Sequence, residues 1–219
     1  MKQWLQPPQL RVSDESEVER RATWLELFYD LVFVVAIAQL AHKLNEDFSL
    51  SGFIGFLALF IPVWWSWIGA AFYANRFDTD DVAHRLLTAL QMLAVGALAV
   101  NVHPGLDENS AGFALAYAAV RTVLVVEYLW ARRHVVAARA LTGRYARGFG
   151  IAAAIWLVSA FVPVPIRFGL WILGLAVDFA TPILAGKLHS QLAPYGHNVE
   201  FRLIANLCHQ TIRCMIFLV

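Results

Sequence analysis

Long apolar runs separated by short polar segments dominate the sequence. Each run approaches the roughly 20 residues with which an α-helix crosses the hydrocarbon core of a bilayer. Pro163 and Pro165 leave almost no loop between the last two runs, which are predicted to form a tight helical hairpin, or a span followed by a partly re-entrant segment. The pattern predicts an all-α polytopic membrane helix bundle with about six transmembrane helices. The runs are residues 24–42, 52–73, 86–102, 111–130, 149–163 and 166–185.

The lysine and arginine residues fall almost entirely on one side of this predicted bundle. The N-terminal tail, the second and fourth connections and the C-terminal tail hold nearly all of the 17 basic residues. The opposite side has only Lys43 and Arg167, and Arg121 lies inside a span. Because cytoplasmic loops carry an excess of Lys and Arg, both termini are predicted to be cytoplasmic. The predicted divisions are a tail at 1–23, a six-helix transmembrane domain at 24–186 and a tail of atypical sequence at 187–219.

Composition agrees with a membrane protein and excludes several other classes. Hydrophobic residues make up 59% of the chain and charged residues 15%, against about 45–50% and about 25% in soluble domains. A net charge of +1, with no basic face interleaved with aromatic residues, argues against nucleic-acid binding. Cys208 and Cys214 both lie in the C-terminal tail, where they cannot form a disulfide framework, and their spacing does not fit a structural zinc site. We therefore predict no cofactor and no metal.

Charged residues inside the spans are the candidate functional groups. A carboxylate at hydrocarbon depth costs about 2.5–3.5 kcal/mol on insertion scales, so it needs a partner, a water-filled cavity or a function. Glu26 and Asp30 lie four residues apart on one face of the first span. Asp30, Arg121 and Asp178 fall at nearly one depth on the first, fourth and sixth spans. They are predicted to form a shared interhelical cluster in which the arginine holds at least one aspartate ionised.

Two further carboxylates make the predicted interior acidic. Glu26 and Glu127 fall roughly 9–10 Å from the centres of their spans, toward the cytoplasm. In a structural interpretation, Arg121 bridges the aspartates and fastens three helices together, while Glu26 and Glu127 reach water. In a functional interpretation, the carboxylates line a hydrated path, and one of them exchanges protons or binds a cation. The acidic surplus favours the functional interpretation.

Two segments carry a resemblance to a known family. Residues 21–34, RATWLELFYDLVFV, resemble the opening signature of the bacterial low-temperature-requirement protein A family. Residues 73–81, YANRFDTDD, and the RLL and QML segments that follow resemble its second signature. The resemblance covers about residues 18–194. It implies a multi-span protein of the bacterial inner membrane, in a family named for growth in the cold rather than for a molecular activity.

The resemblance weakens toward the C-terminus. Members of the family run considerably longer, and beyond residue 196 this chain departs from their usual pattern, so we expect a C-terminally truncated or frame-shifted member. Separately, Phe28-Tyr29-Asp30 is similar to the Phe-Ser-Asp signature of endolysosomal potassium channels, with tyrosine in place of serine and no second copy. That likeness is a hint toward ion permeation.

The sequence thus leaves two functions open. The first is a transporter or channel for protons, cations or a small solute, acting through the cluster of Asp30, Arg121 and Asp178. The second is a non-transporting membrane scaffold or sensor in which the cluster is structural. No metalloprotease, serine-hydrolase or similar motif is present, so we predict no catalytic residue and no enzyme. The expected partner is the lipid bilayer, and the sequence is compatible with a homo-oligomer without specifying one.

Overall fold

The structure is a computed structural model that describes residues 9–10, 24–78, 82–107 and 110–192. Within these residues, six long helices follow one another in the order of the sequence, and a short antiparallel pair of β1 (Gln9–Leu10) and β2 (Phe77–Asp78) lies beside them. The helices are α1 (Trp24–Glu46), α2 (Leu50–Arg76), α3 (Val82–Val100), α4 (Ala111–His134), α5 (Arg139–Ser159) and α6 (Ile166–Leu192).

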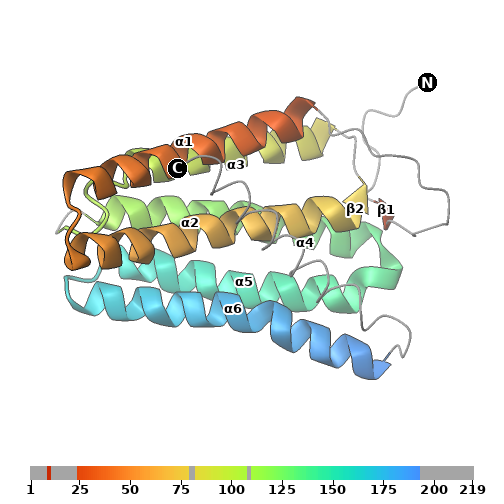
Figure 1. The fold of residues 1–219 in the computed structure, drawn as a ribbon. Coiled ribbons are helices and arrows are strands. Elements are labelled where there is room, and N and C mark those ends of the chain that lie inside the picture. The colour runs from red at the N-terminus through yellow and green to blue at the C-terminus, as the bar shows by residue number, and fades with distance from the viewer. Residues whose placement is uncertain (1–8, 11–23, 79–81, 108–109, 193–219) are drawn as a thin grey trace.

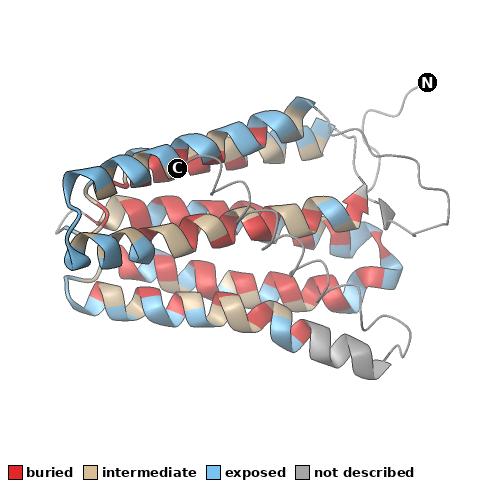
Figure 2. Cartoon of the chain, in the orientation of Figure 1, coloured by how far each residue is buried: buried red, intermediate tan, exposed pale blue. Residues whose placement is uncertain are grey.

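The helices run alternately up and down along one common direction (Figure 1). Helix α4 is central, because it packs against α2, α3 and α5 and is joined to α6 by a salt bridge. Helix α1 packs on α2 and α3, and α6 packs on α5. Among the helices that qualify as spans, α4 has the largest buried share, which Figure 2 shows as a concentration of buried positions in the middle of the bundle.

Five helices of the described part, all except α5, are long and apolar enough to cross a membrane. Their outer faces carry large exposed apolar side chains, such as Leu31 at 57%, Leu93 at 72% and Ile172 at 72% exposure (Figure 2). Water would disfavour so much exposed apolar surface, whereas lipid chains cover it at no cost. The prediction of an all-α membrane helix bundle is confirmed, and these faces contact the bilayer.

Helix α5 begins earlier than the apolar pattern predicted. The predicted run starts at residue 149, but the helix already starts at Arg139. Arg144 and Arg147 interrupt the hydropathy signal without interrupting the helix, because buried residues such as Thr142 and Tyr145 still pack that stretch against the bundle. The short link from α5 to the full-length α6 is the predicted tight hairpin rather than a re-entrant segment.

The basic residues of the connections gather at one end of the bundle. The ends of α2 and α4 and the starts of α3 and α5 lie together there (Figure 1), and Arg76, Arg85, Arg132 and Arg139 lie at these helix ends. The cytoplasmic placement of this end stays a prediction from the charge distribution. The backbone of α6 continues to Leu192, beyond the predicted domain boundary at 186, and most of both predicted tails lies outside the described residues.

At the opposite end, Arg167 ties three helices together. Its Nη1 atom donates to Ser110 Oγ at 2.8 Å, before the start of α4. Its Nε atom donates to the carbonyl oxygens of Ser159 at 3.2 Å and Val162 at 3.1 Å, at the end of α5. Since a buried arginine needs several acceptors, these contacts hold the ends of α4, α5 and α6 in register. This places the middles of α4 and α6 at one level.

Candidate functional site: a buried polar cluster

A buried ion pair joins α4 to α6 in the middle of the bundle. Arg121 Nε lies 3.2 Å from Asp178 Oδ2, and both side chains are fully buried. The Tyr117 hydroxyl donates to the same oxygen of Asp178 at 2.8 Å and accepts from Arg121 Nε at 3.0 Å and Nη2 at 2.7 Å. Tyr117 and Arg121 are four residues apart on α4, so both face α6. Of the predicted cluster of Asp30, Arg121 and Asp178, the structure brings Arg121 and Asp178 together.

Aromatic rings and a glycine complete the surroundings of the guanidinium. Arg121 Cζ lies 5.0 Å from the ring centroid of Tyr117 and 5.3 Å from that of Phe149. On α2, Gly69 lies so close that a Cβ atom there would be 2.9 Å from Arg121 Nη1. The absence of a side chain at position 69 therefore lets α2 approach the charge directly. The cluster is enclosed by α2, α4, α5 and α6.

Several buried polar side-chain atoms in the interior have no hydrogen-bond partner in the described structure. In the described part of the chain, each of the six helices contributes one buried side-chain atom without a hydrogen-bond partner. Such atoms are rare in folded proteins because each costs about 1–3 kcal/mol. A closed structural ion pair does not require them. The atoms are Tyr29 Oη, Trp65 Nε1, Gln91 Nε2, Arg121 Nη1, Trp156 Nε1 and Asp178 Oδ1.

A second acidic group lies further along α4. The 1.5 Å rise per residue places Glu127 about 9 Å from Arg121 along the helix axis. Glu127 is only 3% exposed, so it does not reach water as the structural interpretation of the sequence required. Its Oε1 atom lies 3.9 Å from Nδ1 of His84 on α3, whose side chain is 23% exposed, and the His84 ring stacks on Tyr73 of α2.

Asp30 lies apart from the ion pair, which corrects the predicted three-residue cluster. Its carboxylate accepts a hydrogen bond from Trp67 Nε1 of α2 at 2.9 Å and is exposed, and no ion pair with Arg121 exists within the described residues. The bundle-facing side of α1 carries Tyr29, Phe33 and Leu40 instead, and each residue turns the helix by about 100°. Residue number gives the position along the helix axis, but it leaves the rotation about that axis open. The side chain of Glu26 lies outside the described residues.

Three groups near the candidate site had been missed in the sequence. Tyr117 was detectable, because a tyrosine one turn before a buried arginine shares its helical face. His84 was placed outside the third span, which was predicted to begin at residue 86, whereas α3 begins at Val82. Tyr29 carried no charge signal, yet its buried hydroxyl lies within electrostatic range of both Arg121 and Glu127.

Metal binding has no support in the described part of the chain. No three His, Cys, Asp or Glu side chains of these residues are arranged to hold a metal ion. Cys208 and Cys214 of the C-terminal tail lie outside the described residues.

These features define a class: a helical membrane protein whose spans enclose an ion pair and a further buried carboxylate. Residues 21–203 match the family model of the bacterial low temperature requirement A protein, and the chain belongs to that family. It is 31% identical over 170 residues to an uncharacterized protein of Rhizobium meliloti (strain 1021), a match that covers 77% of this chain and 41% of that protein. The chain thus spans less than half the length of this curated relative. No solved structure matches it.

Proposed function

We propose that this chain is part of a multi-pass transporter of the bacterial inner membrane that moves protons, alone or together with a small solute, along α4. Glu127, Arg121 and Asp178 are the charged groups of the path, and His84 links it to the predicted cytoplasmic end. The observation that carries the proposal is the burial of Glu127, an acidic group in excess of the Arg121–Asp178 pair.

The number of charges supports a functional role for Glu127. One arginine and one aspartate are enough to fasten α4 to α6. A further carboxylate in the span is costly, and buried ionisable residues of membrane helices are typically functional. His84 is the ionic contact of Glu127 within the described residues. Since histidine is neutral or charged near neutral pH, this pair can take up and release a proton, which a fixed arginine cannot.

The arrangement favours protons over metal cations. Arg121 stays charged in the middle of the bundle and already occupies Oδ2 of Asp178, so that oxygen is not free to bind a metal cation. A sodium or potassium ion would also need several oxygen ligands arranged around it. A proton needs only hydrogen-bonding groups at intervals, and Tyr29 supplies one within electrostatic range of both Glu127 and Arg121. Asp178 Oδ1, unpartnered in the described structure, is an acceptor beyond them.

Proton flux into liposomes tests the proposal directly. The purified chain is reconstituted with a pH-sensitive dye inside the vesicles, and a potassium gradient with valinomycin drives proton entry. We expect Glu127→Gln to lower the proton flux at least tenfold while far-UV circular dichroism stays unchanged. Asp107→Asn removes an exposed acid of the loop before α4 in the same way and serves as the matched control. Equal flux in wild type and Glu127→Gln would remove Glu127 from the path, and no flux from either would refute transport by this chain.

A membrane scaffold or sensor is the second candidate, and two observations favour it. The Arg121–Asp178 pair is direct and fully buried, and Asp30, which the sequence placed in the same cluster, instead bonds Trp67 outside it. Under this candidate the pair only fastens helices. Asp178→Asn would then lower the free energy of unfolding, and neither wild type nor variant would conduct protons.

A further inference from the structure

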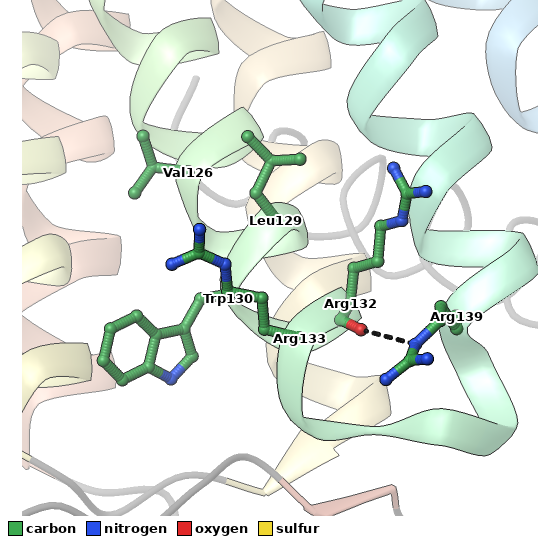
Figure 3. Close-up of a pocket in the computed structure, with 6 residues that line it drawn as sticks. All are labelled: Val126, Leu129, Trp130, Arg132, Arg133 and Arg139. Carbon is green, nitrogen blue, oxygen red and sulfur yellow. Dashed lines mark hydrogen bonds between the residues drawn. The ribbon is translucent and has the colours of Figure 1, made fainter.

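A second site lies away from the buried cluster, at the corner where α4 ends and α5 begins. A pocket of about 630 Å³ opens there, next to the short helical turn η1 (Val136–Ala138) that joins the two helices. Figure 3 shows the six side chains that line it, three of which are arginines and none of which is acidic. They are Val126, Leu129, Trp130, Arg132, Arg133 and Arg139.

The lining of the pocket is partly apolar and partly basic. Val126 and Leu129 are exposed and lie on α4 toward the middle of the span. The guanidinium of Arg132 extends back to the level of these two side chains, whereas Arg139 and the ring of Trp130 lie nearer the end of the bundle (Figure 3). Trp130 thus lies where amphipathic rings settle at the level of lipid headgroups. An occupant of this pocket therefore meets apolar side chains and positive charge together.

Two of the three arginine side chains in the pocket have contacts that hold them in place, but these contacts do not neutralise their charges. Arg139 Nε donates to the backbone oxygen of Arg132 at 3.3 Å (Figure 3). The guanidinium of Arg132 lies over Gly143 of α5, where a Cβ atom would be 3.2 Å from its Nε atom. Within the described residues, none of the three arginines forms an ion pair with a carboxylate. An anion is the ligand that such a group of guanidinium donors binds best.

Helix stability alone does not explain all three arginines. Arg132 and Arg133 lie in the last turn of α4, where a positive charge interacts favourably with the helix dipole. Arg139 is the first residue of α5, where the same dipole disfavours a positive charge, and the first turn of α5 contains no acid. The bond from Arg139 Nε to the carbonyl oxygen of Arg132 caps the last turn of α4, but it leaves the charge of the guanidinium without a counter-ion. A bound anion supplies that counter-ion and removes the unfavourable interaction with the dipole of α5.

We propose that this pocket binds an anionic glycerophospholipid of the surrounding leaflet. The phosphodiester lies among Arg132, Arg133 and Arg139, with Trp130 at the headgroup level, and an acyl chain covers Val126 and Leu129. The volume is that of a small-molecule site and far exceeds one phosphate ion. Basic pockets between membrane helices on the predicted cytoplasmic side are where acidic lipid headgroups bind. This site does not depend on proton transport by the central cluster.

Lipid titration of the full chain in a neutral detergent tests this site. Native mass spectrometry and intrinsic tryptophan fluorescence follow the binding of phosphatidylglycerol, phosphatidylcholine and inorganic phosphate. We expect tighter binding of phosphatidylglycerol than of phosphatidylcholine by at least tenfold, and no competition from inorganic phosphate at millimolar concentration. Equal binding of the two lipids would overturn the proposal, and so would competition by inorganic phosphate, which would indicate a free-anion site instead.

A double variant locates the lipid. Each arginine facing an anionic membrane surface contributes roughly fivefold in affinity, so Arg133→Gln with Arg139→Gln should weaken phosphatidylglycerol binding roughly 25-fold. Both side chains are exposed, so the fold should survive, which far-UV circular dichroism verifies. Arg144→Gln removes one charge from α5 outside the pocket and is the control. If Arg144→Gln weakened binding as much as the double variant, the charge of the whole end would be responsible and the pocket would be refuted.

Discussion

Removing the carboxylate of the central ion pair should destabilise the protein more than any exposed charge change. Asp178→Asn keeps the size of the side chain but leaves Arg121 as an uncompensated charge in the interior. At the observed separation of 3.2 Å and an effective dielectric constant of about 20, the attraction between the two charges is about 5 kcal/mol. Breaking a buried pair by removing one partner typically costs about 3–5 kcal/mol. We therefore expect a loss of about 3–5 kcal/mol in the free energy of unfolding.

Removing both charges should restore most of this loss. Replacing a buried ion pair by apolar residues of similar volume is often neutral or stabilising, because no charge then remains to be desolvated. Arg121→Met combined with Asp178→Leu should therefore be much closer to wild type than either single variant. Because the two side chains contact each other, the double-mutant cycle should give a strongly non-additive result.

Reversible unfolding in mixed micelles, followed by tryptophan fluorescence as the SDS fraction rises, measures these free energies. Asp107→Asn is the control for loss of one acidic charge, and should change stability by less than about 0.5 kcal/mol. A loss below about 1 kcal/mol for Asp178→Asn, or additive effects in the cycle, would show that the pair does not hold α4 to α6. The same variants measured for proton flux separate the transporter from the scaffold.

Two other substitutions test the helix packing and the start of α2. Gly148→Val should cost about 1–3 kcal/mol through overpacking, because a Cβ atom at 148 would clash with the side chain of Thr181. Gly96→Ala, in open space, should be neutral or stabilising in the same SDS titration. Ser49→Ala should cost about 1 kcal/mol by removing the N-cap of α2. Hydrogen bonds from Ser49 lower the pKa of Asp47, so Ser49→Ala should raise that pKa toward its ordinary value in an NMR titration. In wild type, ionised Asp47 stabilises the fold, and this stabilisation is lost as the pH falls through the lowered pKa. In the variant, the stabilisation should be smaller. The backbone N–H of residue 49 donates to Asp47 Oδ1 in both proteins, so an unchanged Asp47 titration would contradict a contribution from the Ser49 hydroxyl.

Much of the fold was predictable because a bilayer restricts what a chain can do. Backbone groups in hydrocarbon must bond within their own segment, so each long apolar run becomes a helix. Helix ends were less predictable, because hydropathy reports the thickness of the hydrocarbon rather than the length of the helix. Arg144 and Arg147 delayed the predicted start of the fifth run to residue 149, although α5 already starts at Arg139. For the same reason His84 was left outside the predicted third run, although it lies in α3.

The sequence alone determined the membrane class and the family, and it placed Arg121 and Asp178 at nearly one depth. Residue number gives depth along a helix through the fixed rise of 1.5 Å, and two opposite charges at one depth attract each other strongly where water is excluded. Only the tertiary structure decided which side of each helix faces the interior, because spans that are apolar on all sides carry little periodic signal. That rotation turned Asp30 toward Trp67 and buried Glu127 beside His84. It also brought Arg139 of α5 next to the last turn of α4, which no spacing in the sequence specifies.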